Sequence, residues 1–353
     1  MDYNYSYDNY EDSNGNSTFM YTPFIFNFRP NSTEVITPYK WVALLIYIAV
    51  FCLGVPGNAL VVWMTAFEMK RTVNTVWFLN LAIADLACCL VVPFSIMEIA
   101  LYGRWPLGLF LCKCLPSVLL VNMYASVLLL TVISIDRCAL VIKPVWCQNK
   151  RTVKKAYLAC LVVWLFAFLW SSPSFIFRQT VKRFDAIKCS MQYSLLGAHQ
   201  QKTENIIAIF RFLIGFIIPF LVITISYSIL VSKVSGRFSQ SSKTMKVVLV
   251  VIIGFFVCWF PYHVAGIILA AHSNNSSLYI STLNIDPILI SIAFVNSCIN
   301  PIIYVLVGRD FKTKFKQSIT SILRNVLTDE VSQTFDSKKT KSTSDTKNTE
   351  THV

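Results

Sequence analysis

Residues 110–137 read FLCKCLPSVLLVNMYASVLLLTVISIDR, and the 22 positions between Lys113 and Asp136 carry no charged side chain. A helix needs about 20 apolar residues to cross the hydrocarbon core of a bilayer, which is roughly 30 Å thick. This block is too long and too apolar for a core helix of a soluble protein. The stretch therefore predicts a membrane-spanning helix that ends at the acid–base pair Asp136 and Arg137.

Six further apolar stretches of similar length lie on either side of this one. The seven predicted spans cover residues 41–66, 75–100, 110–137, 156–177, 206–232, 246–270 and 286–307. The composition agrees, since 55% of the 353 residues are hydrophobic and only 14% are charged. A soluble protein of this length would need more Lys, Glu, Arg and Asp to cover its surface. The predicted fold class is an all-α membrane protein, a seven-transmembrane helix bundle.

Basic residues gather in the connections that follow the first, third, fifth and seventh predicted spans. They are Lys70, Arg71, Lys143, Lys150, Arg151, Lys154, Lys155, Lys233, Arg237, Lys243, Lys246, Arg309, Lys312, Lys314 and Lys316. Short cytoplasmic connections are enriched in Lys and Arg, so this face is predicted to be cytoplasmic and the N-terminus extracellular. The net charge of +13 comes largely from this asymmetry. The sequence thus predicts a multi-pass plasma-membrane protein and not a nucleic-acid-binding one.

The chain divides into four predicted segments. Residues 1–40 form an acidic, tyrosine-rich outer tail, and residues 41–308 form the helix bundle. In residues 309–323, apolar residues recur every three to four positions among basic ones, which predicts an amphipathic eighth helix at the membrane surface. Residues 324–353 are rich in Ser, Thr, Lys and Asp, a composition typical of a disordered cytoplasmic tail.

The predicted outer face carries signals for covalent modification. Five Asn-x-Ser/Thr triplets, all on that face, begin at Asn4, Asn16, Asn31, Asn274 and Asn275. Acidic residues alternate with tyrosines in the tail, a context that predicts sulfation of Tyr3, Tyr5, Tyr7 and Tyr10. A strongly anionic tail would attract a basic protein ligand, with contacts expected at Tyr7, Asp8, Tyr10 and Asp12. The alternative interpretation is a disordered tail that only keeps the protein soluble.

Several polar residues lie within the predicted spans, where their burial in the membrane costs free energy and therefore needs an explanation. The set comprises Asn58, Asp85, Asn122, Ser126, Asn296 and Asn300. Asp85 is the most costly member, since a carboxylate at that depth must be protonated, paired or bound to a cation. The preferred hypothesis is a network that binds an allosteric sodium ion near Asp85 and rearranges on activation. A purely structural hydrogen-bond network remains the alternative, and no other cofactor is expected.

Three short motifs lie near the inner ends of the third and seventh predicted spans and within the sixth. They are Asp136-Arg137-Cys138, Cys258-Trp259-Phe260-Pro261 and Asn300-Pro301-Ile302-Ile303-Tyr304. Proline inside a helix removes a backbone hydrogen bond and produces a kink. Each motif alone is weak, but in this order and with one motif per helix the set closely resembles the rhodopsin-like (class A) G-protein-coupled receptors. The resemblance covers residues 41 to about 325.

This resemblance implies roles in G-protein coupling and activation for Asp136, Arg137, Trp259, Pro261, Asn300, Pro301 and Tyr304. Arg137 is expected to face the G protein in the active state, and Trp259 and Tyr304 to move with their helices. The third residue of the first motif is Cys138, where the family usually has tyrosine. No Asp or Glu occurs between Glu204 and Asp286. Arg137 therefore lacks an acidic partner on the sixth span, which predicts higher basal activity.

The family pattern also implies a disulfide on the outer face. In the family, a cysteine that follows a tryptophan at the start of the third span forms a disulfide with the loop between the fourth and fifth spans. The spacing from Trp105 identifies Cys112 as this cysteine, and Cys189 lies in the loop. Cys114 is the competing partner. Such a bond would hold the loop over the end of the bundle.

Charged residues near the outer ends of the spans predict a ligand pocket. Arg178 ends the fourth span, Arg211 lies about one and a half turns into the fifth, and Asp286 opens the seventh. Arg178, Arg211 and Tyr262 suit a peptide C-terminus that carries a free carboxylate and a basic side chain. Glu204, predicted at the entrance, suits a basic side chain. The alternative is a purely structural pair between Arg211 and Asp286.

Within the family, four further stretches resemble the complement anaphylatoxin receptors. They are TAFEMKRT (65–72), WFLNLA (77–82), KPVWCQN (143–149) and LRNVLT (323–328). The resemblance implies a basic ligand, the anaphylatoxin of the fifth complement component, bound at two sites, the acidic tail and the bundle pocket. It also implies coupling to inhibitory G proteins, calcium release and chemotaxis. Receptors for formylated or other chemotactic peptides and, less favoured, a transporter or channel are the alternatives. No metalloprotease or hydrolase motif is present, so no enzyme is predicted.

The end of the predicted eighth helix and the inner tail together hold fourteen Ser or Thr residues, from Ser318 to Thr351. Phosphorylation adds negative charge that a partner protein can read. We expect receptor kinases to modify this segment and arrestin to bind it afterwards. The predicted phosphorylation sites are Ser332, Thr334, Ser337, Ser342, Thr343 and Ser344.

Overall fold

The computed structural model describes residues 36–183, 186–193, 199–234, 242–272 and 275–307, with the backbone alone described at 183, 234, 242–248 and 302–307. The chain divides into two compact units, residues 1–303 and 304–353. The first unit contains the helix bundle. Most of the predicted outer tail, the predicted eighth helix and the inner tail lie outside the described residues.

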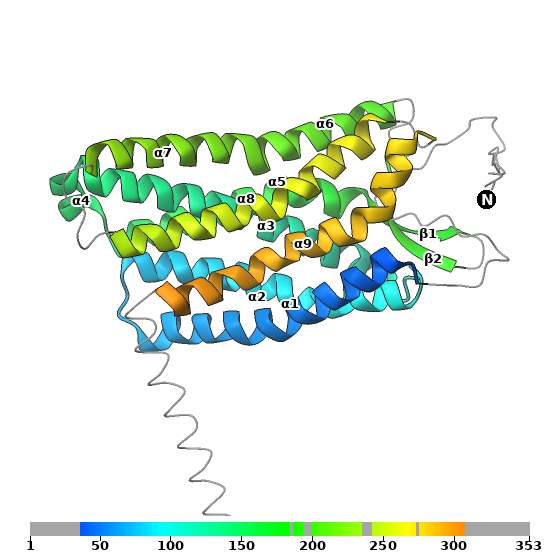
Figure 1. Ribbon diagram of the computed structural model, residues 1–353, viewed down its shortest axis with the longest axis horizontal. Helices are drawn as coiled ribbons and strands as arrows, with labels where there is room; N and C mark the ends of the chain where they lie inside the picture. Colours follow the sequence, from blue (N-terminus) through cyan, green and yellow to red (C-terminus); the bar gives the residue numbers. More distant parts are fainter. Residues whose placement is uncertain (1–35, 184–185, 194–198, 235–241, 273–274, 308–353) are drawn as a thin grey trace, which may run out of the picture. The chain divides into compact units, whose positions relative to one another are not determined.

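Seven segments of the described chain are long and apolar enough to cross a membrane, which confirms the predicted seven-helix bundle (Figure 1). In chain order they are α1 (Pro38–Trp63) continued by the π-helix η1 (Met64–Glu68), α2 (Val73–Ala100), α3 (Gly108–Ile142), α5 (Val153–Phe177), α6 (Gln200–Phe212) continued by the π-helix η3 (Leu213–Ile217) and α7 (Ile218–Val234), α8 (Ser242–Ala271) and α9 (Ser277–Val307). A spanning helix forms its backbone hydrogen bonds internally, because the lipid tails around it offer no hydrogen-bonding groups.

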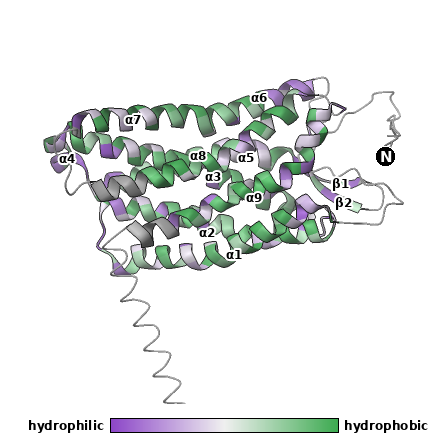
Figure 2. Ribbon diagram, in the orientation of Figure 1, coloured by the Kyte–Doolittle hydropathy of each residue, from purple (hydrophilic) through white to green (hydrophobic). Residues whose placement is uncertain are grey.

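The bundle has its apolar residues on the outside as well as the inside. Large side chains such as Leu45, Leu165 and Val257 are largely exposed on its surface. Figure 2 shows hydrophobic residues over most of each helix and hydrophilic ones concentrated towards the ends. This distribution is expected where the helices face hydrocarbon, because lipid tails are as apolar as the side chains that touch them.

The third span occupies the centre of the bundle. α3 contacts α2, α5, α7 and α8. In an 18-residue apolar stretch of each span, the share of buried residues is 72% in α2 and 61% in α3. It is 28% in each of the spans that contain α1, α5 and α6–α7. Trp164 of α5 donates a hydrogen bond from Nε1 to Asn80 Oδ1 of α2, at 2.9 Å. Asp85, Asn122 and Ser126 of the predicted polar network therefore lie on the two most enclosed helices, while its other members lie on α1 and α9.

All seven spanning helices begin earlier than predicted, and α6 and α9 differ most from the prediction. α9 begins at Ser277, nine residues before the predicted start, and the Tyr279 N–H is capped by Ser276 Oγ at 3.1 Å. Asp286 consequently lies inside the helix and does not open it. α6 begins at Gln200, so Arg211 lies about three turns into the helix and not one and a half. The hydropathy pattern marks only the apolar part of a helix, whereas its polar first turns extend beyond that part.

A two-stranded antiparallel sheet connects α5 to α6, a feature that the all-α prediction lacked. β1 (Arg178–Arg183) pairs with β2 (Ala186–Met191), and Thr180 lies opposite Cys189. The Trp105 N–H donates to Ile187 O at 2.7 Å, which ties the hairpin to the chain before α3. The hairpin lies at one end of the bundle, and the short helix α4 (Pro144–Lys150) lies at the other (Figure 1).

Helix α1 packs very closely against α2 and α9 at one glycine. A Cβ atom at Gly54 would collide with Cys89 Sγ and would lie 3.1 Å from Cys298 Sγ. Only glycine leaves room for the two sulfur atoms at this position. The contact explains why a helix-weakening residue stands in the middle of a long span.

We predict that Gly54→Ala destabilises the protein by about 1–3 kcal/mol, because overpacking forces neighbouring side chains out of place. Thermal unfolding of the detergent-solubilised protein measures the effect. Adding Cys89→Ala to the same chain removes the colliding sulfur and should restore most of the loss. A higher melting temperature for Gly54→Ala alone, the usual result of such a change in an unobstructed helix, would contradict the packing argument.

Candidate ligand-binding site

A cavity of about 360 Å³ lies at the hairpin end of the bundle. All five residues of the bundle that the sequence predicts as ligand contacts line it, and these are Arg178, Glu204, Arg211, Tyr262 and Asp286. They come from four elements: Arg178 begins β1 directly after α5, Glu204 and Arg211 lie on α6, Tyr262 on α8 and Asp286 on α9. Aromatic and aliphatic side chains form most of the remaining wall, including Tyr124, Trp170 and Phe294. The tertiary structure thus brings together charges that are more than 100 residues apart in the chain.

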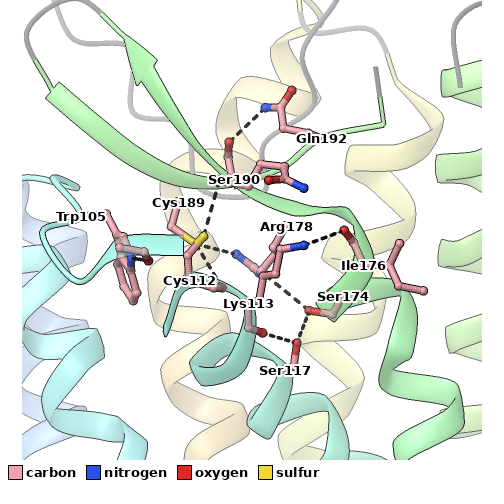
Figure 3. Close-up of a disulfide and its surroundings, with 12 residues drawn as sticks. Trp105, Cys112, Lys113, Ser117, Ser174, Ile176, Arg178, Cys189, Ser190 and Gln192 are labelled. Atoms are coloured by element: carbon pink, nitrogen blue, oxygen red, sulfur yellow. Dashed lines mark hydrogen bonds between the residues drawn. A yellow bond between two sulfur atoms is a disulfide. The ribbon is translucent and has the colours of Figure 1, made fainter. Parts of the chain in front are cut away.

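The predicted disulfide between Cys112 and Cys189 is present, and Cys114 is a free thiol. Both bonded cysteines are buried, and Trp105 packs against them. Figure 3 shows the bond between Trp105 on one side and Arg178 on the other. It holds β2 against α3, so that Cys189 forms part of the cavity wall.

Arg178 stands at the junction of α5 and β1 and is only 9% exposed. Its Nε donates to Ser174 Oγ at 3.4 Å, and one terminal nitrogen lies 4.0 Å from Cys189 Sγ (Figure 3). Burial lowers the pKa of the guanidinium from its ordinary value, and the nearby Glu98 carboxylate opposes this. These two contacts are long, so an anion in the cavity would be a stronger partner for this group.

The guanidinium of Arg211 lies against one face of α8. One of its terminal nitrogens donates to the Tyr262 hydroxyl at 3.1 Å, and its central carbon lies 5.3 Å from the centre of the Tyr262 ring. One turn further on, a Cβ atom at Gly266 would lie 3.0 Å from the other terminal nitrogen. Tyr262 therefore orients the guanidinium, and the absence of a side chain at Gly266 leaves room for it.

Two acidic residues face the same cavity. Asp286 is 5% exposed, and its Oδ2 has no hydrogen-bond partner. Arg211 lies within electrostatic reach of it. Glu204, predicted at the entrance, accepts a hydrogen bond from Gln200 at 3.5 Å and is buried in the cavity wall. Both carboxylates can accept further hydrogen bonds from a cation.

A second cluster lies deeper in the bundle around Asp85, which is fully buried. Asn300 Nδ2 donates to Asp85 Oδ2 at 2.6 Å. We assign the Asn122 amide with its nitrogen towards Asp85 Oδ1, at 3.2 Å, and its oxygen towards Ser297 Oγ, also at 3.2 Å. Asn122 also lies 3.3 Å from Ser126 Oγ.

The remaining members of this cluster are connected less directly. Asn58 donates to the backbone oxygens of Gly54 and Ser297, at 2.9 and 2.7 Å. Asn296 is buried, but its Nδ2 has no hydrogen-bond partner. The sequence missed Ser297, whose single hydroxyl in an apolar helix gives little signal. The cluster links α1, α2, α3 and α9.

At the other end of α3, Asp136 pairs with the loop residue Arg151 and not with its neighbour. Arg151 donates to Asp136 Oδ1 at 2.7 Å and to Oδ2 at 2.9 Å. Arg137 and Arg151 each donate to Asn74 Oδ1 of α2, at 2.8 Å. The sequence missed both Asn74 and Arg151, because a lone Asn at a helix start and one of many loop arginines carry no distinctive pattern.

Trp259 lies fully buried between these regions. Its ring is 5.5 Å from the Tyr262 ring, in a T-shaped contact, and 6.0 Å from the Phe255 ring. Pro261 lies within α8 and Pro301 within α9. The side chain of Tyr304 is not among those described.

Several predicted sites fall outside the described residues, and their roles stay predictions. In the outer tail and outer loop these are Tyr3, Asn4, Tyr5, Tyr7, Asp8, Tyr10, Asp12, Asn16, Asn31 and Asn274. In the inner tail they are Ser332, Thr334, Ser337, Ser342, Thr343 and Ser344. Asn275 is described and is exposed in the turn between α8 and α9, where a glycan could attach.

Comparison with known proteins places this architecture in a family. Residues 57–304 match the family described as 7 transmembrane receptor (rhodopsin family). The C5a anaphylatoxin chemotactic receptor 1 of Oryctolagus cuniculus is 46% identical over 85% of this chain and 86% of its own length. The human protein of that name is 45% identical over 86% and 87%. The C3a anaphylatoxin chemotactic receptor of Danio rerio is 41% identical over 87% and 83%.

We predict that Tyr262→Phe lowers the stability of the protein, because it removes a hydrogen bond between the half-buried Arg211 guanidinium and the Tyr262 hydroxyl. A hydrogen bond to a charged group contributes about 1.5–3 kcal/mol, which thermal unfolding in detergent can detect. Tyr157→Phe is the matched control, since Tyr157 accepts a hydrogen bond from Arg71 at 2.7 Å in an exposed position. Water can replace that bond, so the control should change little. Equal effects of the two changes would contradict a special role for Tyr262.

Proposed function

Because the chain belongs to the rhodopsin family of seven-transmembrane receptors, we propose that it is a chemoattractant receptor for the basic anaphylatoxin of the fifth complement component. Relatives of that name are similar to this chain over most of its length. The observation that carries the ligand class is the cavity, which holds two arginines and several carboxylates in one apolar space. Such a space suits a peptide end that carries charges of both signs.

The ligand binds at two sites. Its basic body is held by the acidic tail, residues 1–40, through electrostatic attraction that also speeds encounter. Its C-terminal arm enters the cavity, where Arg211 and Arg178 bind the terminal carboxylate. Arginine presents a fork of donors that matches a carboxylate, so this end gives direction to the arm. Glu204 and Asp286 accept basic groups of the ligand.

The structural effect of ligand binding at Arg211 can be transmitted to the centre of the bundle through one series of contacts. Arg211 is hydrogen-bonded to Tyr262, and the Tyr262 ring touches Trp259. A carboxylate that draws Arg211 away from Tyr262 frees that ring and changes the packing of Trp259. Pro261 lies between the two aromatic residues and removes a backbone hydrogen bond of α8, which makes this a point where the helix can bend.

The change in the packing of Trp259 and in the bend of α8 is then transmitted to the inner end of α3. Arg137 is held by Asn74, while Asp136 is engaged by Arg151, so the arginine that meets the G protein has no acidic partner among its described hydrogen bonds. The receptor couples to G proteins of the inhibitory class and drives calcium release and chemotaxis. After activation, phosphorylation between Ser332 and Ser344 recruits arrestin, and removal of the chain after Asp329 should slow internalisation.

A sodium ion fits the cluster around Asp85. Asn300 Oδ1 and Asn58 Oδ1 are buried without hydrogen-bond partners, and oxygen atoms of this kind are the ligands that hard cations prefer. Asp85 and the hydroxyl of Ser297 would hold the ion, which would supply a positive charge that links α2 to α9. Asn300 and Asn122 keep the carboxylate oriented towards the cluster.

A second ligand is favoured by one specific observation. The zebrafish C3a anaphylatoxin chemotactic receptor is nearly as similar to this chain as the mammalian C5a receptors. The anaphylatoxin of the third complement component is therefore the second candidate ligand. Formylated peptides are the third, and they would not depend on the acidic tail.

The deciding experiment measures inhibition of cyclic AMP formation and calcium release in cells that express the chain. The cells receive the recombinant fifth-component anaphylatoxin, with the third-component anaphylatoxin and a formylated peptide in parallel. We expect a response to the first ligand, none with Arg137→Ala, and a curve shifted to higher concentration when residues 2–20 are removed. Binding without signalling would indicate a decoy receptor. A response to another ligand alone would overturn the assignment.

The sodium proposal has its own test. We predict that sodium weakens binding of the activating ligand to membranes that carry the wild-type chain, compared with N-methylglucamine at the same ionic strength. Asp85→Asn should bind the ligand equally in both salts, because the amide removes the negative charge that attracts the ion. Sodium sensitivity that survives in Asp85→Asn would place the ion elsewhere.

A further inference from the structure

The connection between α1 and α2 contains an arginine that has no part in the mechanism described above. Arg71 is exposed and lies two residues before the start of α2. One of its terminal nitrogens donates to the Tyr157 hydroxyl of α5 at 2.7 Å, and the other donates to Ala66 O at 3.0 Å. These bonds hold the guanidinium against the start of α5, so its position is defined although it lies at the surface.

The same tetrapeptide, Lys-Arg-Thr-Val, occurs at residues 70–73 and 150–153, and each copy leads into a spanning helix. In both copies the threonine side chain accepts a hydrogen bond from a backbone N–H of the first helical turn. The two arginines cross between the helices. The arginine before α5 donates to Asn74 of α2 at 2.8 Å, and the arginine before α2 donates to Tyr157 of α5. The two connections therefore brace α2 against α5 in the same way.

The two arginines differ in the charge of their partners. Arg151 binds both oxygens of the Asp136 carboxylate, at 2.7 and 2.9 Å. Among the described residues, Arg71 donates only to a hydroxyl and a backbone carbonyl and forms no ion pair. These bonds leave further N–H groups of the guanidinium for another acceptor. Hydrogen bonds between charged partners are about twice as strong as those between neutral ones, so an anion would be the strongest additional partner for Arg71.

Further cations lie near Arg71. Three exposed lysines stand beside it in the chain or in the first turn of α5, and these are Lys70, Lys154 and Lys155. Residues three apart are neighbours on a helix surface, so Lys154 lies beside Tyr157, which Arg71 contacts. Glu68 is the one acidic residue in the connection, and α4 and α5 contain none. This basic surface therefore combines four cationic groups with one carboxylate.

Aromatic and aliphatic residues place the basic surface at the level of the lipid headgroups. The rings of Trp63 and Phe67, at the end of α1 and in η1, lie 4.9 Å apart, and both side chains are half exposed or more. Exposed tryptophan is typical of the boundary between hydrocarbon and headgroups. Towards the membrane centre, Leu158, Leu161 and Leu165 follow Lys154 on α5 at three-to-four spacing, and all are more than half exposed. This leucine stripe favours a phospholipid over a soluble partner, because acyl chains lie directly beneath a lipid phosphate.

We propose that the basic surface around Arg71 and Lys154 binds a multiply charged anionic phospholipid, an inositol phospholipid with more than one phosphate group on its ring. The phosphates bind Arg71 and the lysines, and an acyl chain lies along the leucine stripe. Several phosphates match several cations, whereas a headgroup with a single charge leaves most of the cations unpaired. Clusters of basic residues next to a spanning helix attract such lipids from the cytoplasmic leaflet, and this end of the bundle is predicted to be cytoplasmic. The site does not depend on which ligand the cavity takes.

The test uses the full-length chain in nanodiscs of phosphatidylcholine that contain a small fraction of photoreactive phosphatidylinositol bisphosphate. Illumination attaches the probe to the residues that it contacts, and mass spectrometry identifies the attached peptides. Discs with photoreactive phosphatidylserine or phosphatidylcholine measure the dependence on headgroup charge. The variant is Arg71→Gln/Lys154→Gln. The matched control is Lys143→Gln/Lys233→Gln, which removes the same charge from exposed positions elsewhere on the basic face.

We expect the bisphosphate probe to label the connection before α2 and the start of α5, at least about tenfold more than the phosphatidylcholine probe. Arg71→Gln/Lys154→Gln should reduce this labelling by about tenfold or more, because each basic residue at a membrane surface adds to the attraction of anionic lipid. Lys143→Gln/Lys233→Gln should keep it. Unlabelled bisphosphate lipid should displace the probe at a much lower concentration than soluble inositol trisphosphate, since only the lipid also contacts the leucine stripe.

Four outcomes would overturn the lipid site. They are equal labelling by the phosphatidylcholine probe, attachment to other helices, equal labelling of the two double variants, and equally effective displacement by soluble inositol trisphosphate. The first two need only the wild-type chain, so misfolding of a variant cannot obscure them. Unchanged labelling of Arg71→Gln/Lys154→Gln, combined with lost G-protein coupling in detergent free of anionic lipid, would assign the surface to a protein partner instead.

Discussion

Each polar group inside the bundle must find its partner within the bundle, because the surrounding hydrocarbon offers none. This constraint produces the helices, whose backbones satisfy themselves, and it also determines where side-chain polarity can lie. Asp85 is surrounded by amides and a hydroxyl, Asp136 by an arginine, and Trp164 by an asparagine. The buried groups that remain unpartnered, such as Asp286 Oδ2, are consequently the most informative features of the interior.

One helix connects all the regions in which polarity concentrates. α3 carries Cys112 at the hairpin end, Asn122 beside Asp85, and Asp136 with Arg137 at the other end. It is also the helix with neighbours on most sides. A displacement of the helices around α3 must therefore alter the cavity, the Asp85 cluster and the Arg137 site together. Close packing favours discrete arrangements over gradual deformation, which suits a protein that reports between two faces of a membrane.

The cavity owes its character to the hairpin as much as to the helices. The disulfide fixes β2 to α3, and Arg178 emerges at the start of β1 with Ser174 and Cys189 as its neighbours. A guanidinium placed there has little room to turn towards water. In the same cavity, Tyr262 orients Arg211, and Gly266 leaves room for its guanidinium. The two arginines are thus held in place before any ligand arrives, which reduces the ordering that binding requires.

The sequence by itself determined the seven spans, the family motifs and the residue types of the pocket, because hydropathy over about 20 residues and short motifs are local properties. It also identified Arg178, Arg211, Tyr262 and Asp286, which the structure brings to one cavity. Only the tertiary structure decided which residues pair, as Asp136 does with Arg151 and Asp85 with Asn300. It alone also placed Glu98 in the cavity wall. The physical reason is that the direction of a side chain from its helix follows from the sequence, whereas its partner depends on how neighbouring helices are tilted, rotated and packed. The early starts of α6 and α9 show the same limit, since polar first turns lie beyond the apolar pattern and only helix capping and packing define them.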